Sequence, residues 1–282
     1  MSKSVAALAM LLLLTASLQA QEKVARPTAI LGAMGEEVAL LESRITDKRE
    51  QKIQGIVFLT GKLNGRPVVL ARAGVGKVNA AVTTTLLIEH FNPSEVIFTG
   101  IAGAVNPDLF PGDVVIAART AQHDYGANLA NRFEHRGAPS PLDGRRNPVF
   151  IPADARLLAA ADRAGRSAQF DKIKVDDAER MPKVIKGVIV TGDSFIGSSA
   201  KKSELRKLLE ADAVEMEGAA VAQVCWQQNV PCLIIRSISD RADANAQRDI
   251  ANFLSVAAQN SARLVAAILE QLESVRSSGA RR

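Results

Sequence analysis

The sequence contains few of the residues that build metal centres, disulfide frameworks or aromatic platforms. Its 282 residues include two cysteines, three histidines and eleven aromatic residues, nine of them Phe. Two cysteines exclude a disulfide framework, and neither a CxxC pattern nor a Cys/His zinc spacing occurs, so we expect no metal site. The shortage of aromatic rings argues against a stacking platform for single-stranded nucleic acid. The 47% of apolar residues is typical of an ordinary globular protein with a full core.

The net charge of +5 and the pI of about 9.4 suit a nucleic-acid-binding protein only if the basic residues gather in one place. They are scattered along the chain, with one small cluster at Arg132, Arg136, Arg145 and Arg146. We interpret them as a solvated surface and predict no nucleic-acid partner. A 5′-phosphate on a small ligand is a second use that the cluster leaves open.

Long hydrophobic runs are also missing, apart from one near the start of the chain. Lys3 precedes an apolar run over residues 5–14, and small residues follow as far as Ala20. Ten residues are too few to cross a bilayer as a helix, for which about 20 are needed. A basic start, a short apolar segment and small residues are typical of a secretory signal peptide. We therefore predict a signal peptide at residues 1–20, a soluble periplasmic or secreted protein at residues 21–282, and no membrane contact after processing. A buried N-terminal helix is the alternative.

Export would permit a disulfide between the two cysteines. Cys225 falls within an expected helix and Cys232 begins an apolar strand, so we interpret them as two buried thiols.

Strand-like and helix-like segments alternate through the rest of the chain. Asn64-Gly65 separates two strand candidates, at 53–60 and 66–73, and is typical of a hairpin turn. Residues 120–150 show little periodicity and are expected to form a long loop or lid. Strands separated by crossover helices predict a single α/β domain with a mixed central β-sheet flanked by helices. The further expected strands are 28–34, 95–99, 113–118, 184–190, 213–216 and 232–239, and the expected helices are 36–43, 78–90, 153–164, 203–210, 217–228 and 249–275.

Ligands of such sheets bind at the carboxyl ends of the strands, so polar groups at strand ends are the candidates for chemistry. Glu36 and Glu37 follow the first strand, where carboxylates also simply stabilise a helix start. Residues 74–77, Gly-Val-Gly-Lys, open a helix and are either an anion-binding turn or a plain turn. The glycines of residues 99–103 would let the backbone approach a ligand closely.

Two further strand ends, 214–218 and 236–240, place acidic residues beside an apolar strand. Such groups are costly to bury unless they are paired or face a cleft. A purely structural pair of Arg236 with a carboxylate is the alternative to a functional site.

Taken together and in order, these motifs resemble the 5′-methylthioadenosine/S-adenosylhomocysteine nucleosidases of the purine nucleoside phosphorylase superfamily. The resemblance extends over residues 28–275 and rests on seven segments: 32–37, 74–78, 99–103, 112–115, 192–196, 214–217 and 236–240. It implies a nucleoside phosphorylase-like fold and hydrolysis of the N-glycosidic bond of an adenosine-type nucleoside.

The resemblance also implies roles for individual residues. Glu37 is similar to the base that activates water, and Asp240 to the general acid that protonates adenine N7. Glu217 corresponds to the residue that accepts the ribose hydroxyls, Met216 packs against the sugar, and Phe195 stacks on the adenine. The other residues implied to bind substrate are Met34, Val75, Ala102, Gly103, Ile196 (whose backbone reads the adenine edge), Glu215, Arg236 (at the water or anion site) and Ser239. The family resemblance implies no metal or organic cofactor, and it implies a homodimer.

Two positions depart from the family pattern. Ile101 stands where many members have a serine that helps to hold water or phosphate, and Ile250 stands where an aromatic residue usually covers the nucleoside. Three alternatives therefore stay open: a purine nucleoside phosphorylase, another purine nucleosidase or nucleotide N-ribohydrolase, and a non-catalytic nucleoside-binding protein with the same fold.

Overall fold

The computed structural model describes residues 25–175 and 178–279. The strands are β1 (Thr28–Gly32), β2 (Thr46–Ile53), β3 (Ile56–Leu63), β4 (Arg66–Arg72), β5 (Glu95–Phe98), β6 (Ile101–Ala104), β7 (Val114–Gln122), β8 (Gly126–Leu129), β9 (Arg132–His135), β10 (Phe150–Pro152), β11 (Ile173–Val175), β12 (Ala178–Arg180), β13 (Val184–Thr191), β14 (Ala213–Glu215) and β15 (Cys232–Asp240). The helices are α2 (Gly35–Arg44), α3 (Lys77–Phe91), α4 (Ala155–Ser167), α5 (Ser199–Leu209), α6 (Gly218–Gln227) and α7 (Ala246–Gly279).

Eleven of the strands form one mixed sheet in the order β10-β7-β13-β14-β6-β15-β5-β1-β4-β3-β2. An additional antiparallel pairing of β7 with β15 curls one half of this sheet back on itself. Strands β7, β13, β14, β6 and β15 thereby close a ring, while β5, β1 and β4 continue from it as a parallel open sheet. The expected α/β fold with a mixed sheet is confirmed.

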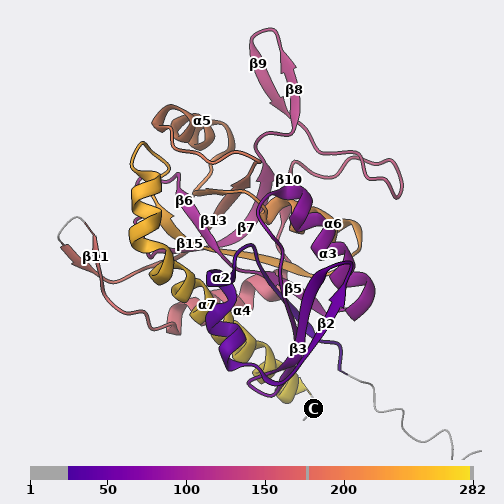
Figure 1. The fold of residues 1–282 in the computed structure, drawn as a ribbon. Helices are drawn as coiled ribbons and strands as arrows, with labels where there is room; N and C mark the ends of the chain where they lie inside the picture. Colours follow the sequence, from indigo (N-terminus) through magenta and orange to yellow (C-terminus); the bar gives the residue numbers. More distant parts are fainter. Residues whose placement is uncertain (1–24, 176–177, 280–282) are drawn as a thin grey trace, which may run out of the picture.

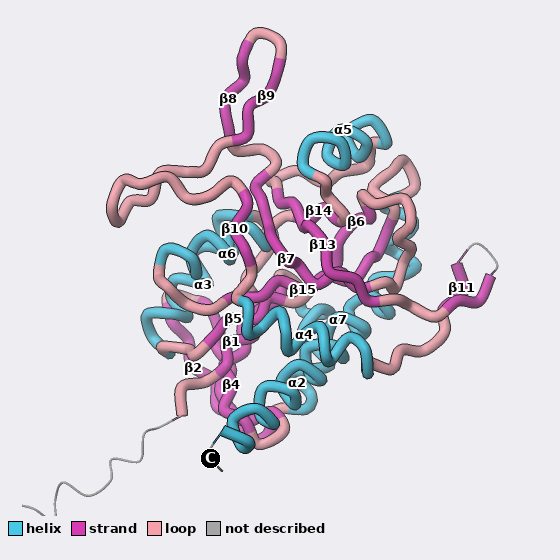
Figure 2. Tube along the Cα trace, turned by 180° about the vertical axis from the view of Figure 1, so that it is seen from behind, coloured by secondary structure: helices cyan, strands magenta, loops and turns pink. Residues whose placement is uncertain are grey.

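The core is divided by the sheet. Helices α2, α4 and α7 cover one face and α3 and α6 cover the other, as both views show (Figures 1 and 2). Each face has its own cluster of buried aliphatic side chains, and a smaller third cluster packs α5 against the end of the ring. The apolar periodicity of these helices therefore reflects burial of one side against the sheet.

Strand β15 connects the two halves of the sheet. Its first residues pair with β5, its middle with β7, and its last residues with β6. The pairing with β6 shifts register between Ile238 and Asp240, which is the signature of a bulge. Bulges re-aim side chains and are frequent beside active sites. Here the bulge immediately precedes the candidate acid, Asp240.

Most expected elements are present, and the differences lie where apolar patterning is weak. Asn64 and Gly65 both have positive φ, which confirms the expected hairpin turn. Strand β2 was not expected because seven of its eight residues are exposed and polar, and β6 was not expected because it is short and contains a glycine. The expected loop over residues 120–150 contains the hairpin β8–β9, which projects from the body, and the edge strand β10 (Figure 1).

The expected signal peptide at residues 1–20 lies outside the described residues. Within the described part of the chain, no helix is long and apolar enough to cross a membrane.

A buried ion cluster fixes the N-terminal ends of β1, β4 and β5. The Glu95 carboxylate is fully buried and accepts hydrogen bonds from Thr28 Oγ1, Arg66 Nη2, Arg156 Nη2 and Ser94 Oγ. Burial alone would raise the pKa of Glu95, but these hydrogen bonds and the charge of Arg66 lower it to about 2. The ionised carboxylate therefore stabilises the fold.

We predict that Glu95→Gln lowers the free energy of unfolding by about 3–5 kcal/mol, because it leaves the buried Arg66 without its counter-charge. Since the pKa of Glu95 is lowered by folding, its contribution is complete above its usual value and is lost as the pH falls toward about 2. Urea unfolding from pH 7 down to acid should show a smaller loss of stability in the variant than in the parent. Glu50→Gln, on the exposed face of β2, is the matched control; equal stability of the two variants would contradict the role of Glu95.

Candidate active site

A cavity of about 210 Å³ opens at the carboxyl ends of β1, β14 and β15, beside β6. Its wall is built from segments far apart in the sequence that the sheet brings together. Of the thirteen residues implied by the family resemblance, twelve line it: Met34, Glu37, Val75, Ala102, Gly103, Phe195, Ile196, Glu215, Met216, Glu217, Ser239 and Asp240. Arg236 is absent from this wall. The cavity is further lined by Ala33, Ile101, Ser194, Val214 and Ile250.

Glu37 is fixed in place by the backbone. It lies in the first turn of α2, where Oε2 accepts a hydrogen bond from the Met34 backbone N–H at 2.8 Å. Oε1 accepts another from the Ile101 N–H at 2.9 Å. The side chain is 3% exposed, and burial raises the pKa of Glu37 while the nearby Arg236 opposes the rise. The carboxyl is therefore held in one orientation at the cavity wall. Glu37 also caps α2, so the same carboxylate stabilises the start of the helix and lines the candidate site.

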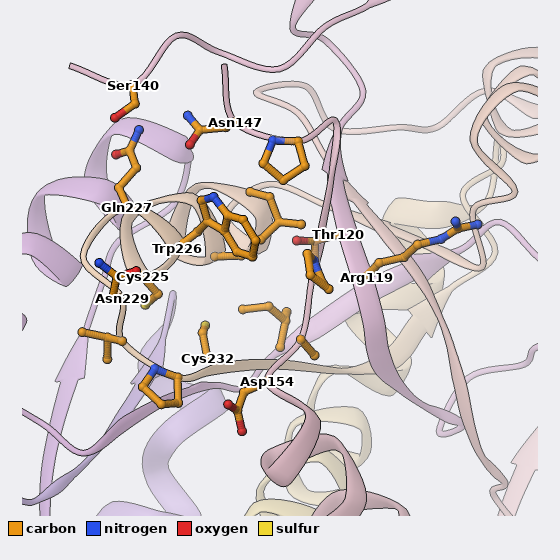
Figure 3. A pocket seen from close by; sticks show the side chains of 18 of the residues that line it. Arg119, Thr120, Ser140, Asn147, Asp154, Cys225, Trp226, Gln227, Asn229 and Cys232 are labelled. Atoms are coloured by element: carbon orange, nitrogen blue, oxygen red, sulfur yellow. The ribbon is translucent and has the colours of Figure 1, made fainter. Parts of the chain in front are cut away.

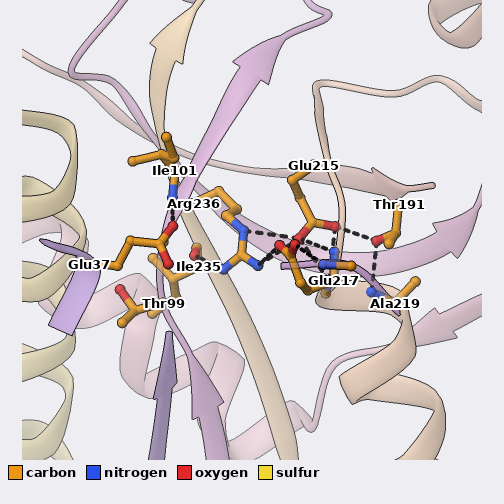
Figure 4. A network of polar contacts seen from close by, with 12 residues as sticks. Glu37, Thr99, Ile101, Thr191, Glu215, Glu217, Ala219, Ile235 and Arg236 are labelled. Atoms are coloured by element: carbon orange, nitrogen blue, oxygen red, sulfur yellow. Dashed lines mark hydrogen bonds and ion pairs between the residues drawn. The ribbon is translucent and has the colours of Figure 1, made fainter. Parts of the chain in front are cut away.

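Arg236 lies behind the wall and organises the carboxylates of the site (Figure 4). It is 1% exposed, its guanidinium packs 4.1 Å from the centre of the Phe98 ring, and Nη2 pairs with Glu215 Oε2 at 2.6 Å. The same nitrogen lies 3.8 Å from Glu217 Oε2. The resemblance implied that Arg236 lines a water or anion site, whereas the structure encloses it and saturates it with charge from its own chain.

Glu215 is likewise occupied by its own chain. Besides Arg236, its carboxylate accepts hydrogen bonds from the backbone N–H groups of Glu217 and Gly218 and from Thr191 Oγ1. Glu215 lines the cavity but is only 7% exposed. This geometry favours a supporting role for Glu215, and it realises the structural arginine–carboxylate pair that the sequence left open.

Glu217 differs because one of its oxygens is uncommitted. Oε1 accepts a hydrogen bond from the Gly76 N–H at 2.8 Å, while Oε2 has only the 3.8 Å ion pair with Arg236. Burial and the neighbouring Glu215 raise the pKa of Glu217 to about 7. An acceptor of this kind suits the hydroxyl groups of a sugar.

Asp240 is the last residue of β15 and lines the same cavity. Its Oδ2 accepts a hydrogen bond from Ser239 Oγ and its Oδ1 one from the Ala242 N–H, both at 2.8 Å. Burial raises the pKa of Asp240, and no cation is among the main influences on it. A carboxyl whose pKa is raised holds its proton more readily and is suited to donate it to a ligand.

The segment at the start of α3 serves the chain's own carboxylates. Gly76 N–H donates to Glu217, and Lys77 N–H donates to Asp193 Oδ1 at 2.8 Å. Both belong to the N–H groups at a helix start that have no partner within the helix. Because they bind carboxylates of the chain, the turn at residues 74–77 positions these side chains and does not present its N–H groups to an external anion.

The loop arginines do not reach this cavity. Arg132 and Arg136 pair with Glu134, Arg145 pairs with Asp143, and Arg146 donates to the Gly137 carbonyl. None of them lines the wall of the site. The second use considered for the cluster, contact with a 5′-phosphate, is therefore not supported by the geometry.

Phe195 and Val75 form an apolar rim. Their side chains are 47% and 49% exposed, although both line the cavity. Exposed apolar groups at the mouth of a polar cavity are suited to cover a flat, partly apolar ligand.

Gly100 is a functional position that the sequence singled out only as part of a glycine motif. A methyl group on its Cα would collide with the Glu37 carboxylate, 2.9 Å from Cδ, and lie 3.1 Å from Arg236 Nη1. The signal was the glycine itself, because close approach of side chains is a main reason for glycine outside turns. Ser194 gave no signal, since its residue type does not suggest a ligand contact, and Val214 was singled out only as part of the motif 214–217.

Comparison with known proteins defines the class. A family model described as the phosphorylase superfamily matches residues 27–270. The 5′-methylthioadenosine/S-adenosylhomocysteine nucleosidase of Staphylococcus epidermidis is 38% identical over 245 residues, 86% of this chain and 99% of that protein. The chain therefore belongs to the 5′-methylthioadenosine/S-adenosylhomocysteine nucleosidase family, and it is an N-glycosyl hydrolase.

Solved structures agree with this assignment. The nucleosidase of Neisseria meningitidis, crystallised with methylthio-immucillin-A, is 37% identical with a TM-score of 0.72 and covers 86% of this chain and 98% of its own. The futalosine hydrolase of Helicobacter pylori is 32% identical with a TM-score of 0.73, over 87% and 98% of the two chains. These similar enzymes act on different substrates, so the substrate of this chain is inferred from the geometry of its site.

We predict that Gly100→Ala lowers kcat by about 10²-fold, because it displaces the Glu37 carboxylate from its two backbone donors. Release of adenine measured by reverse-phase chromatography gives the rate. Gly55→Ala is the control: Gly55 is in an exposed turn with φ of +87° and open space around its Cα, so the variant should lose some stability and keep its turnover. Unchanged kcat in Gly100→Ala would show that the position of Glu37 does not limit the reaction.

Proposed function

We propose that the protein hydrolyses 5′-methylthioadenosine, S-adenosylhomocysteine or a closely related adenosine-type nucleoside and releases adenine. The observation that supports this most directly is the arrangement of three buried carboxyl groups, Glu37, Glu217 and Asp240, around one small cavity with Phe195 at its rim. No other set of groups at the site offers a base, a sugar-binding acceptor and an acid together.

Each carboxyl has a separate task in this proposal. Glu37 removes a proton from the water that attacks the anomeric carbon, and Asp240 donates its proton to N7 of the departing adenine. Glu217 accepts hydrogen bonds from the ribose hydroxyls through its free oxygen. Negative charge beside the sugar also stabilises the positive charge that develops on an oxocarbenium-like ring.

The remaining contacts position the substrate. Phe195 stacks on the adenine, the backbone of Ile196 reads the edge of the base, and Met216 packs against the sugar. The other lining residues, Met34, Val75, Ala102, Gly103 and Ser239, complete the wall. Ser239 acts through its hydrogen bond to Asp240, which orients the acid.

Two observations favour hydrolysis over phosphorolysis. The N–H groups at the start of α3 and the guanidinium of Arg236 are already engaged by carboxylates of the chain. Ile101 offers an aliphatic side chain where a hydroxyl would help to hold phosphate. A phosphate dianion at this site would lie beside carboxylates and would find few unoccupied hydrogen-bond donors. A water molecule is neutral and needs fewer donors.

We expect the purified protein to release adenine from 5′-methylthioadenosine in phosphate-free buffer, and Asp240→Asn to lower kcat by about 10²–10⁴-fold. The amide keeps the shape of the side chain and removes the transferable proton. The released base and the sugar product, which keeps its 5′ substituent and is either free or 1-phosphorylated, are quantified for a panel of S-adenosylhomocysteine, adenosine, AMP and futalosine.

Each result of this panel has one meaning. A 1-phosphate of the sugar product that requires added phosphate would identify a phosphorylase. Tight binding of adenosine analogues without any turnover would identify a binding protein, and either result would overturn the proposal. Equal turnover in Asp240→Asn would reject the role of Asp240 alone.

The pKa of Glu217 predicts the pH dependence. Because burial and Glu215 raise that pKa to about 7, the ionised form that accepts two hydroxyls is lost as the pH falls through about 7. We predict that kcat/KM falls on the acidic side of pH 7, and that Glu217→Gln lowers kcat/KM by about 10- to 100-fold and removes this dependence. Glu36→Gln, at an exposed carboxylate one residue from Glu37, should leave the profile unchanged. A dependence near pH 7 that persists in Glu217→Gln would assign it to another group.

A homodimer is part of the proposal. Val78 and Val82 on α3 are 73% and 49% exposed. An exposed apolar surface on this helix is suited to bind a second copy. Light scattering on the purified protein should give twice the chain mass, and a monomer at micromolar concentration would contradict this.

Export is also proposed, on the basis of Lys3 and the apolar run that follows it. Periplasmic or extracellular fractions should contain a chain that lacks about the first twenty residues by mass spectrometry. A full-length chain confined to the cytosol would contradict the proposal.

A further inference from the structure

A second and larger cavity, of about 630 Å³, lies at the far ends of two elements that build the active site. Helix α6 begins beside Glu217 and ends at this cavity, and β15 begins here and ends at Asp240. Trp226 and the loop over residues 140–148 form much of its wall (Figure 3). No residue of the proposed reaction lies in this cavity.

Both cysteines of the chain line it, on facing elements. Cys225 lies in the last turns of α6 and is fully buried, whereas Cys232 is the first residue of β15 and is partly exposed. Their side chains approach one another across the floor of the cavity and belong to the same apolar cluster (Figure 3). The expectation of two buried thiols is therefore wrong for Cys232, which a solvent-borne reagent can reach through the cavity.

The backbone around the two thiols is anchored. The Val230 N–H donates to the Cys225 carbonyl at 2.9 Å, which closes the turn between α6 and β15. On the other side, the Cys232 carbonyl accepts a hydrogen bond from the Asp154 N–H at 3.1 Å. Two thiols held in proximity by fixed backbone meet the main condition for a disulfide.

The two sulfurs are chemically unequal. A hydrogen bond with Cys232 and complete burial raise the pKa of the Cys225 thiol well above its ordinary value. Thiolates are the attacking species in disulfide exchange, so Cys225 is slow to react with an external disulfide. Cys232, at the cavity wall, is the sulfur that such a reagent meets first.

We propose that Cys225 and Cys232 form a reversible disulfide that staples the end of α6 to the start of β15. In the first step, the Cys232 thiolate attacks a small disulfide such as oxidised glutathione, which gives a mixed disulfide on Cys232 and releases one thiolate. Cys225 then attacks the Cys232 sulfur, and the expelled second thiolate takes up the Cys225 proton. The two cysteines lose two electrons, and the small disulfide gains them as two thiols.

The direct test is intact-mass spectrometry of the purified protein after incubation with oxidised glutathione. We expect a loss of about 2 Da, which dithiothreitol reverses, and a tryptic peptide that contains a 225–232 bond. An unchanged mass, a stable glutathione adduct of about 305 Da, or a disulfide between two chains would each overturn the proposal.

Two variants separate the roles of the thiols. Cys225→Ala removes the resolving thiol, so it should retain the glutathione adduct on Cys232. Cys232→Ser removes the accessible thiol, so its mass should stay unchanged under the same conditions. Rapid modification of Cys225 in Cys232→Ser would contradict the proposed order of attack.

The staple should also stabilise the fold, since a cross-link over eight residues restricts the unfolded chain. We expect the oxidised protein to melt about 5 °C above its reduced form in calorimetry. Cys232→Ser should melt at one temperature with or without oxidised glutathione. An oxidised form that melts at or below the reduced form would contradict a stabilising bond. None of these readouts depends on nucleosidase activity.

Discussion

The site depends on one buried cation. Arg236 has its guanidinium enclosed between the Phe98 ring and the carboxylates of Glu215 and Glu217, and Glu37 lies on its other side (Figure 4). Three carboxylates this close and this buried would repel one another strongly in a medium of low dielectric constant. With Arg236 among them, Glu215 is fixed by an ion pair, and the other two carboxyl groups are held at the cavity wall. The guanidinium of Arg236 is buried against groups of its own chain. It therefore influences a ligand through the carboxylates that it pairs with.

The ring of strands explains how these groups meet. Arg236 and Asp240 are four residues apart on β15, and in a regular strand they would point to the same face. The bulge after Ile238 changes that register, and Asp240 turns into the cavity while Arg236 stays beneath it. The antiparallel pairing of β7 with the middle of β15 closes the ring around Arg236 and shields it from water. The ring and the bulge together therefore bury the charge of Arg236 and leave the Asp240 carboxyl accessible from the cavity, within five residues of one strand.

The sequence predicted the helices and strands that bury one face against the core. Its motifs predicted most of the residues that line the cavity. It could not predict β2, because an exposed edge strand such as Thr46–Ile53 has no apolar alternation and is held by pairing with β3. It also placed Glu215 with Glu217 among the substrate-binding residues, since the supporting role of Glu215 becomes visible only when its hydrogen bonds are known. The sequence also could not predict that Arg236 is buried. Burial is a property of the assembled ring, and local sequence carries little information about it.

The surroundings of Glu37 and Asp240 also suggest which is the base and which is the acid. Burial raises the pKa of both, but the charges that act on them are opposite. Arg236 favours the ionised form of Glu37, whereas Asp243 and Asp249 near Asp240 favour its neutral form. Two carboxyls with charges of opposite sign beside them are suited to opposite roles at one pH. The positive charge beside Glu37 suits it to the role of base, and the negative charges beside Asp240 suit it to the role of acid, as hydrolysis of a nucleoside requires.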